Sequence, residues 1–349
     1  MFKHELDKLG LESFSELYEL DYRLSKDGKL VSLKYKHLGV DFSNPIVAMS
    51  RGLILEVGSW KVVARPYEKF FTYPDERAAE LDWASTVAYN KYDGSLAILY
   101  FYDGKWRVGS SGTPDGQWLV KDESATFEEL FWQGMEPNAE QFDALFGDKA
   151  YTYLFEVTSP SQRIVHNYKG TTSTLHGIIE TATGKDVSLE GNLLNKAHVI
   201  GRPSSMQKAL TMLDVHKLEE GLVLRDDKGN RIKFKTEDYK RLHILAGSRK
   251  AMLAEVKASG GLLNDAELTF VWPEAISIAK NVEAYVSMYP ALEQYVHGMT
   301  NKQIALDSKL TKQAKSLVFA IKAGKAKTPK QFVQTKMALT IFVELFDHD

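Results

Sequence analysis

The chain has 349 residues, of which 44% are hydrophobic and 26% are charged, with a formal net charge of -2. This is an ordinary composition for a soluble globular protein, and any surface that attracts nucleic acid must be local. The chain contains no cysteine, which excludes disulfides, thiolate zinc sites and cysteine nucleophiles. No stretch approaches the roughly 18 apolar residues of a membrane span, so we expect a cytoplasmic protein without membrane contact.

The first two thirds of the chain predict a β-rich domain. Residues 1–20 carry apolar side chains at helical spacing and predict a short amphipathic helix. From Lys29 to about Lys235, short β-rich runs alternate with turn signals, and a helical insert at about residues 124–146 interrupts them. Many strands with few helices between them predict antiparallel sheets packed on each other, which is an α+β fold.

The last third predicts a helical domain. Beyond Tyr239 the sequence shows helical patterns to its end, so we expect one domain at residues 1–243 and an all-helical domain at 244–349, with Gly260 and Gly261 forming a turn. A lysine-rich stretch follows, in which Asp307 is the only acidic residue. Its nine lysines are residues 302, 309, 312, 315, 322, 325, 327, 330 and 336. This basic face fits a solvated helix surface and a contact with nucleic acid equally well.

The segment AYNKYDGSLAILY contains the first candidate for chemistry. Lys91, Asp93, Gly94 and Ser95 lie where one predicted strand ends and the next begins. Taken alone, this K-x-D-G element also fits a surface lysine beside an ordinary hairpin turn. Its interpretation therefore depends on other elements of the chain.

Three further elements follow in order. Glu156 lies within an apolar strand, where a carboxylate needs a cationic partner or a hydrated metal ion. Glu220 enters a later strand, and Lys233 and Lys235 share one face of the next strand by period-2 alternation. Two lysines on a buried face are costly unless an anion such as a triphosphate lies between them.

Together these elements resemble the covalent nucleotidyltransferase superfamily of ATP-dependent ligases and capping enzymes. They are most similar to the family of the T-even bacteriophage RNA ligase 1, a tRNA-repair ligase. The resemblance covers about residues 45–243 and implies an antiparallel-sheet nucleotidyltransferase (adenylation) domain of the ATP-grasp-like ligase type. The matching segments are Ser50–Gly52, Arg65–Phe71, Lys91–Ser95, Phe155–Val157 with Ser159–Pro160 and Arg163–Val165, Glu220–Gly221, and Lys233–Lys235 leading to Tyr239.

The resemblance implies a role for each matching residue. Lys91 would attack the α-phosphate of ATP and carry AMP covalently, and the catalytic set would be completed by Asp93, Lys233 and Lys235. A lysine amine attacks only when unprotonated, and neighbouring positive charge favours that form. Asp93, Glu156 and Glu220 would hold Mg²⁺ or Mn²⁺ through water. The nucleotide would be bound by Arg51, Lys69, Phe71, Lys91, Gly94, Glu156, Glu220, Lys233 and Lys235.

The implied reaction seals RNA. AMP would pass from Lys91 to an RNA 5′-phosphate, and a 3′-hydroxyl would then displace it. The resemblance suggests single-stranded or nicked RNA, in particular tRNA, as the substrate of a monomeric phage protein in the host bacterial cytoplasm. One departure concerns a basic residue that the family often has after the nucleotidyl motif. Ser110 and Ser111 stand there instead, and Arg107 or Lys105 could compensate.

Alternatives remain open at this point. A DNA ligase or a capping guanylyltransferase would usually continue into a small β-barrel, whereas this sequence reads as helix. A non-catalytic RNA-binding protein would use the lysine-rich tail alone, and a P-loop enzyme is excluded because its glycine-rich motif does not occur. His166 and His176 are expected to be hydrogen-bonded strand residues. Tyr35 and Tyr239 are candidates for nucleotide or RNA contact.

Overall fold

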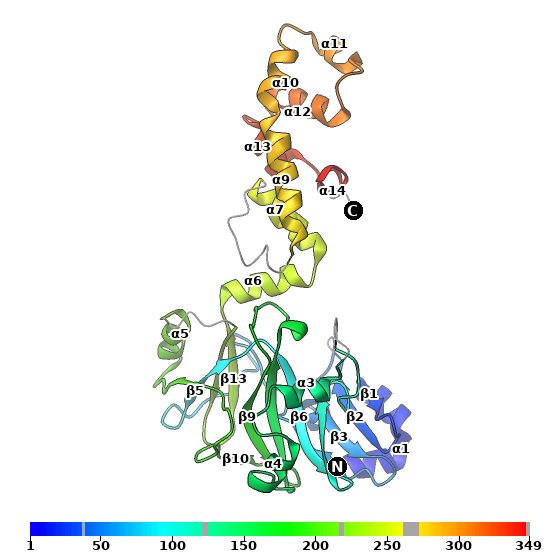
Figure 1. Cartoon of the computed structure of the whole chain (residues 1–349), viewed down its shortest axis with the longest axis vertical. Helices are drawn as coiled ribbons and strands as arrows, with labels where there is room; N and C mark the ends of the chain where they lie inside the picture. Colours follow the sequence, from blue (N-terminus) through cyan, green and yellow to red (C-terminus); the bar gives the residue numbers. More distant parts are fainter. Residues whose placement is uncertain (37–38, 121–124, 216–219, 261–271, 347–349) are drawn as a thin grey trace. The chain divides into compact units, whose positions relative to one another are not determined.

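A computed structural model describes residues 1–36, 39–120, 125–215, 220–260 and 272–346. The chain divides into two compact units, Met1–Tyr239 and Lys240–Asp349. In Figure 1 the first unit contains the strands, and the second consists of helices. Each unit is described by itself.

An antiparallel sheet and a helix form the N-terminal layer of the first unit. Helix α1 (Phe2–Leu17) buries Phe2, Leu6 and Phe14 against this sheet and has a kink at Gly10. The short helix α2 (Pro45–Met49) begins at the Asn44 cap, whose side chain accepts from the amide of Ile46. The strands, in sheet order, are β1 (Leu20–Leu24), β2 (Leu30–Tyr35), β3 (Arg51–Glu56) and β4 (Val62–Ala64).

The central sheet has a core on each face. One face packs on the N-terminal sheet through residues such as Ile54, Ile98 and Leu154. The other is covered by the expected helical insert, which forms α3 (Phe127–Gln133) and α4 (Ala139–Leu145) and buries several aromatic rings. The strands, in sheet order, are β10 (Asp186–Val187), β9 (Thr172–Glu180), β8 (Tyr151–Thr158), β6 (Ser95–Tyr102) and β7 (Lys105–Ser110), and a single turn of 3₁₀ helix follows β8 at Pro160–Gln162.

A third antiparallel sheet bears the candidate site. Its apolar face, which includes Leu222, Ile232 and Phe234, packs against α5 (Met206–Val215) and part of the segment that precedes β5. Because strand side chains alternate, the neighbouring residues of the same strands face the opposite way. The strands, in sheet order, are β11 (Val199–Gly201), β5 (Val87–Lys91), β12 (Gly221–Arg225) and β13 (Arg231–Lys235).

The second unit is helical throughout its described residues. Gly260 ends α7 in the left-handed conformation that glycine adopts readily, and Gly261 lies outside the described residues. Seven of the nine lysines between Asn301 and Lys336 are exposed, and Lys315 and Lys330 are half-buried. The helices are α6 (Glu237–Ala246), which crosses the division between the units, α7 (Arg249–Ser259), α9 (Glu274–Ser287), α10 (Tyr289–Tyr295), α11 (Asn301–Leu306), α12 (Lys312–Lys322), α13 (Pro329–Gln331), a π-helical turn (Phe332–Lys336) and α14 (Leu339–Phe346).

The predicted fold class is confirmed. All three sheets are antiparallel, and helices follow them toward the C-terminus. Sequence periodicity did not predict β1, β10, β11 or α5. No helix within the described parts of the chain is long and apolar enough to cross a membrane.

Candidate active site

The polar face of the third sheet forms a regular grid of side chains. The strand registers place residues of β5, β12 and β13 side by side in three rows. The rows are Lys91, Gly221 and Lys235; Tyr89, Val223 and Lys233; and Val87, Arg225 and Arg231. Since Lys91 and Lys235 flank a glycine, their side chains can approach the same space from both sides.

A cavity of about 190 Å³ lies over this grid. Its other walls include Leu96, Glu156 and His176 of the central sheet, and Arg51 at the start of β3. The lining contains six cationic side chains and only two carboxylates, so it favours a polyanionic ligand. The cationic residues are Arg51, Lys91, Arg225, Arg231, Lys233 and Lys235, and the carboxylates are Glu156 and Glu220.

Glu220 connects the two lysines of the first row. Its side chain is 2.6 Å from Lys91 Nζ through Oε2 and 3.0 Å from Lys235 Nζ through Oε1. Glu220 is only 3% exposed, whereas the side chains of Lys91 and Lys235 are 20% and 25% exposed, so a buried carboxylate connects two half-buried ammonium groups. The next residue must be glycine, because Gly221 has φ +155° and a Cβ there would overlap the carbonyl oxygen of Phe234.

Lys233 carries the largest electrostatic perturbation among the lysines of the site. Burial lowers the pKa of Lys233 from 10.5 to about 7, and the charges of Arg51, Lys69 and Lys91 act in the same direction. Its Nζ lies 5.1 Å from the centroid of the Phe70 ring. This lysine is therefore ready to accept an anionic partner, which would restore its positive charge.

Glu156 and His176 form the opposite wall. Burial raises the pKa of Glu156 to about 7, although nearby Lys91 opposes this shift. Burial and the charge of Arg51 lower the pKa of His176 to about 3, so this imidazole is neutral. His176 Nε2 and Arg51 Nη1 are buried without a hydrogen-bond partner among the described residues. Such orphaned polar atoms indicate a cavity shaped for a polar ligand.

The Asp93 carboxylate is hydrogen-bonded outside the cavity around Lys91. Its carboxylate accepts hydrogen bonds from the amides of Val165 and His166 at 2.8 and 2.7 Å and from the Tyr239 hydroxyl at 2.6 Å. Asp93 is 2% exposed and does not line the cavity. Within the described ranges, no three His, Asp or Glu side chains gather as a metal-binding group. The expected convergence of Asp93 with Glu156 and Glu220 is thus not seen.

Gly94 allows the central sheet to approach the K-x-D-G element at residues 91–94. A Cβ at this position would overlap the carbonyl oxygen of Val157 and would lie 2.9 Å from the Cγ of Glu156. The glycine therefore contributes by letting Glu156 come close to Lys91, a role that requires no contact with a ligand.

Lys69 and Phe71 line a neighbouring cavity instead of the one around Lys91. The Lys69 ammonium lies 5.0, 4.8 and 5.3 Å from the ring centroids of Tyr35, Phe42 and Phe71. Cation–π attraction thus holds the side chain among three rings. Phe71 and Tyr35 therefore both pack beside the Lys69 side chain.

The residues considered as replacements for the missing basic residue lie elsewhere. Arg107 forms an ion pair with Asp27 at 3.5 Å and lines a separate cavity together with Lys105. Ser110 makes a hydroxyl contact with Thr113 at 3.2 Å. Neither Ser110 nor Ser111 lines the cavity around Lys91.

Other lining residues were not singled out from sequence. Arg225 and Arg231 flank Asp186, which forms an ion pair with Arg231 and lies 3.8 Å from Arg225. Alternation along β12 and β13 could have placed both arginines on the face of Lys233. His176, expected to be a hydrogen-bonded strand residue, does lie 3.3 Å from the Tyr67 hydroxyl through Nδ1, but it also lines the cavity.

Comparison with known proteins identifies the family. A family model described as RNA ligase matches residues 49–239, which is more than half of the chain. An RNA ligase of Rhodothermus phage RM378 is 28% identical over 43% of this chain and 41% of that protein. A protein of Autographa californica nuclear polyhedrosis virus, whose name combines polynucleotide kinase and RNA ligase, is 29% identical over 46% of this chain and 25% of that protein. The chain thus spans less than half the length of either relative.

A solved structure of an archaeal ATP-dependent RNA ligase has 13% identity and a TM-score of 0.46, covering 93% of this chain and 90% of that one. The matched segment, residues 49–239, contains Lys91, Glu156, Glu220, Lys233 and Lys235. The predicted family is confirmed: the chain belongs to the RNA ligase family.

Proposed function

We propose that the chain is an ATP-dependent RNA ligase in which Lys91 is the nucleophile. The observation that carries this proposal is the Lys91 amine, held at 2.6 Å by a buried glutamate inside a cavity with six cationic side chains and two carboxylates. Asp186 pairs with Arg225 and Arg231, and the other four cations still outnumber the two carboxylates of the lining. The excess positive charge matches a triphosphate.

The chain's own residues account for the positioning that phosphoryl transfer requires. Lys233, Lys235 and Arg51 would bind phosphate oxygens, since they surround the Lys91 amine. Lys69, held among its three aromatic rings, would reach phosphates from the neighbouring cavity. Tyr239 and the amides of Val165 and His166 fix Asp93, which in turn positions the turn that bears Lys91.

Adenylation forms a bond between Lys91 Nζ and the α-phosphorus of ATP and breaks the bond to pyrophosphate. Attack requires the ammonium to lose one proton, and Glu220 Oε2 is the acceptor within hydrogen-bond distance. The positive charges around the phosphates stabilise the departing pyrophosphate.

A divalent metal fits the carboxylates that face this cavity. Glu156 and Glu220 would hold Mg²⁺ or Mn²⁺ through water, because their side chains line this cavity and carboxylate oxygens are suitable partners for the water shell of these ions. Asp93, whose carboxylate accepts hydrogen bonds from Tyr239 and from two amides, would act by positioning. When bound, the ion neutralises phosphate charge.

The later steps use RNA. AMP would pass from Lys91 to a 5′-phosphate, and a 3′-hydroxyl would then form the phosphodiester bond and release AMP. We propose single-stranded or nicked RNA, including tRNA, as the substrate of a monomeric enzyme, with the lysines of the second unit contacting RNA phosphates.

The test is mass spectrometry of the protein after incubation with ATP and magnesium. We expect a mass gain of one adenylate on the peptide that contains Lys91, and none in Lys91→Ala. Parallel incubation with GTP separates ligation from mRNA capping. An adduct that survives in Lys91→Ala, or labelling by GTP alone, would refute the proposal.

A further inference from the structure

A larger cavity adjoins the one around Lys91. Its volume is about 520 Å³, compared with about 190 Å³ for the cavity over the grid. It is enclosed by residues 65–71, by the turn between β9 and β10 and by the turn between β12 and β13. Tyr67, Phe70 and Arg231 line both cavities, so the two spaces share a wall. Of the residues that line this second cavity, the proposed adenylation step uses Lys69 and leaves the two turns without a role.

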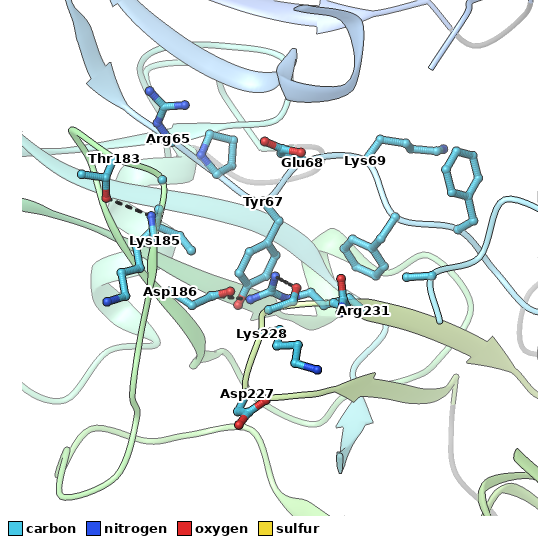
Figure 2. A pocket seen from close by; sticks show the side chains of 18 of the residues that line it. Arg65, Tyr67, Glu68, Lys69, Thr183, Lys185, Asp186, Asp227, Lys228 and Arg231 are labelled. Carbon is cyan, nitrogen blue, oxygen red and sulfur yellow. Dashed lines mark hydrogen bonds and ion pairs between the residues drawn. The ribbon is translucent and has the colours of Figure 1, made fainter. Parts of the chain in front are cut away.

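Arg231 is the centre of the shared wall. Its guanidinium lies 3.8 Å from the centroid of the Tyr67 ring, forms an ion pair with Asp186 and donates to the carbonyl oxygen of Gly229. Figure 2 shows Tyr67, Arg231 and Asp186 together, with Lys69 on one side of the cavity and Lys185 on the other. The arginine is thus fixed between the two ligand spaces and can contact both.

Positive charge exceeds negative charge in this lining. Six cationic side chains face three carboxylates; Asp186 is paired with Arg231, and Arg77 is paired at 2.7 Å with Asp75, which does not line the cavity. Lys185 is exposed, and Lys228 forms an exposed ion pair with Asp82 at 3.3 Å. Exposed pairs of this kind contribute little, so Lys228 can exchange Asp82 for a phosphate.

Aromatic rings lie beside the cations. The Arg77 guanidinium is 4.3 Å from the centroid of the Phe71 ring, and the Lys69 ammonium is 5.3 Å from it. Sites for single-stranded nucleic acid combine these two elements, because bases stack on rings while cations bind the backbone. The volume also lies within the range of ligand sites, about 300–1,000 Å³.

We propose that this cavity binds the terminal nucleotides of a single-stranded RNA, so that the RNA end meets the adenylate across Arg231. The proposal rests on the proposed ligase function and adds the place at which the enzyme receives its second substrate. Phosphates of the strand contact Lys185 and Lys228 at the rim, and a base near the end stacks on Phe71.

The test compares two double variants with the same change in net charge. Lys185→Glu with Lys228→Glu alters the rim, and Lys8→Glu with Lys61→Glu alters exposed lysines that do not line the cavity. Binding of a 5′-phosphorylated single-stranded RNA is measured by fluorescence anisotropy without ATP over a range of salt concentrations. We expect the rim variant to bind about tenfold or more weakly, with a salt slope reduced by roughly 1 to 2. The control variant should bind within about twofold of the unmodified protein.

Two further measurements complete the test. Adenylation by ATP labelled at the α-phosphate should be unchanged in the rim variant, and a parallel loss of adenylation would overturn the proposal by assigning the cavity to ATP. Equal RNA affinity of both double variants would overturn it too.

A fluorescent base analogue at the 5′ or the 3′ terminal nucleotide shows by its quenching which end enters the cavity, and no quenching at either end contradicts the proposal. Because binding is measured without ATP, failure of the unmodified protein to form an adenylate would refute the ligase function separately.

Discussion

Replacing Lys233 should make the free protein more stable while removing its activity. In the folded state the pKa of Lys233 is lowered from 10.5 to about 7 by burial and by neighbouring cations. At about 1.36 kcal/mol per pH unit, this difference corresponds to about 4 to 5 kcal/mol of destabilisation when the lysine is fully charged. The Lys233 ammonium keeps part of its hydration in the folded protein, which reduces this destabilisation. We therefore expect Lys233→Met to raise the free energy of unfolding by roughly 2 kcal/mol at neutral pH.

The sign of the pH dependence follows from the lowered pKa of Lys233. The unfolded chain binds the proton more tightly than the folded chain, so the penalty is fully present below about pH 7. It decreases as the pH rises toward 10.5, because the lysine then becomes neutral in both states. The advantage of the methionine variant should therefore shrink as the pH rises above neutrality.

Urea unfolding of both proteins between pH 6 and pH 9.5 measures this effect. Lys61→Met, at an exposed position, serves as the control and should change stability by less than about 0.5 kcal/mol. Lys233→Met should also lower the rate of adenylation at least about 100-fold, because a cation beside the phosphates is lost. A methionine variant that is less stable than the unmodified protein, or a stability gap that does not vary with pH, would refute the reasoning.

Three other substitutions test the site. Glu220→Gln leaves Lys91 and Lys235 facing each other without a counter-charge. Adenylation measured with labelled ATP should therefore fall at least about 100-fold, and the free energy of unfolding should fall by roughly 1 to 3 kcal/mol. Unchanged adenylation would exclude the proposed role of this glutamate. Gly221→Ala should destabilise the unit by more than about 2 kcal/mol in urea unfolding, because its Cβ meets the Phe234 carbonyl; near-neutral stability would contradict the described register. Tyr239→Phe removes the hydrogen bond from the Tyr239 hydroxyl to buried Asp93 and should cost about 1 to 2 kcal/mol in urea unfolding. Its loss of adenylation should be smaller than that of Glu220→Gln, and a larger loss would give Tyr239 a direct role in the chemistry.

Local sequence was sufficient to predict the longer strands. Runs such as LVSLKY and SLAILYFY carry turn signals at their ends and enough β-branched or aromatic residues to predict β2 and β6. The two- and three-residue strands β10 and β11 have no such signal, since they are strands only because β9 and β5 offer them hydrogen-bonding partners. Their position depends on the neighbouring strand and not on their own residues.

The motif residues were found from sequence because each one lies in a recognisable local pattern. Period-2 alternation placed Lys233 and Lys235 on one face of a strand, and the registers align them with Lys91 through β12. Asp93 shows the limit of that reasoning. Its neighbours in sequence do not reveal that Tyr239, 146 residues away, holds its carboxylate away from the cavity.

The sequence by itself determined the antiparallel fold class and the longer strands, because alternation and turn residues are local properties of the chain, and its ordered motifs pointed to the family. Only the tertiary structure decided the charge state and the neighbours of each functional group. Lys91 and Glu220 are 129 residues apart in the chain and 2.6 Å apart in the structure. Electrostatic energy depends on such distances and on burial, which the folded sheets alone establish.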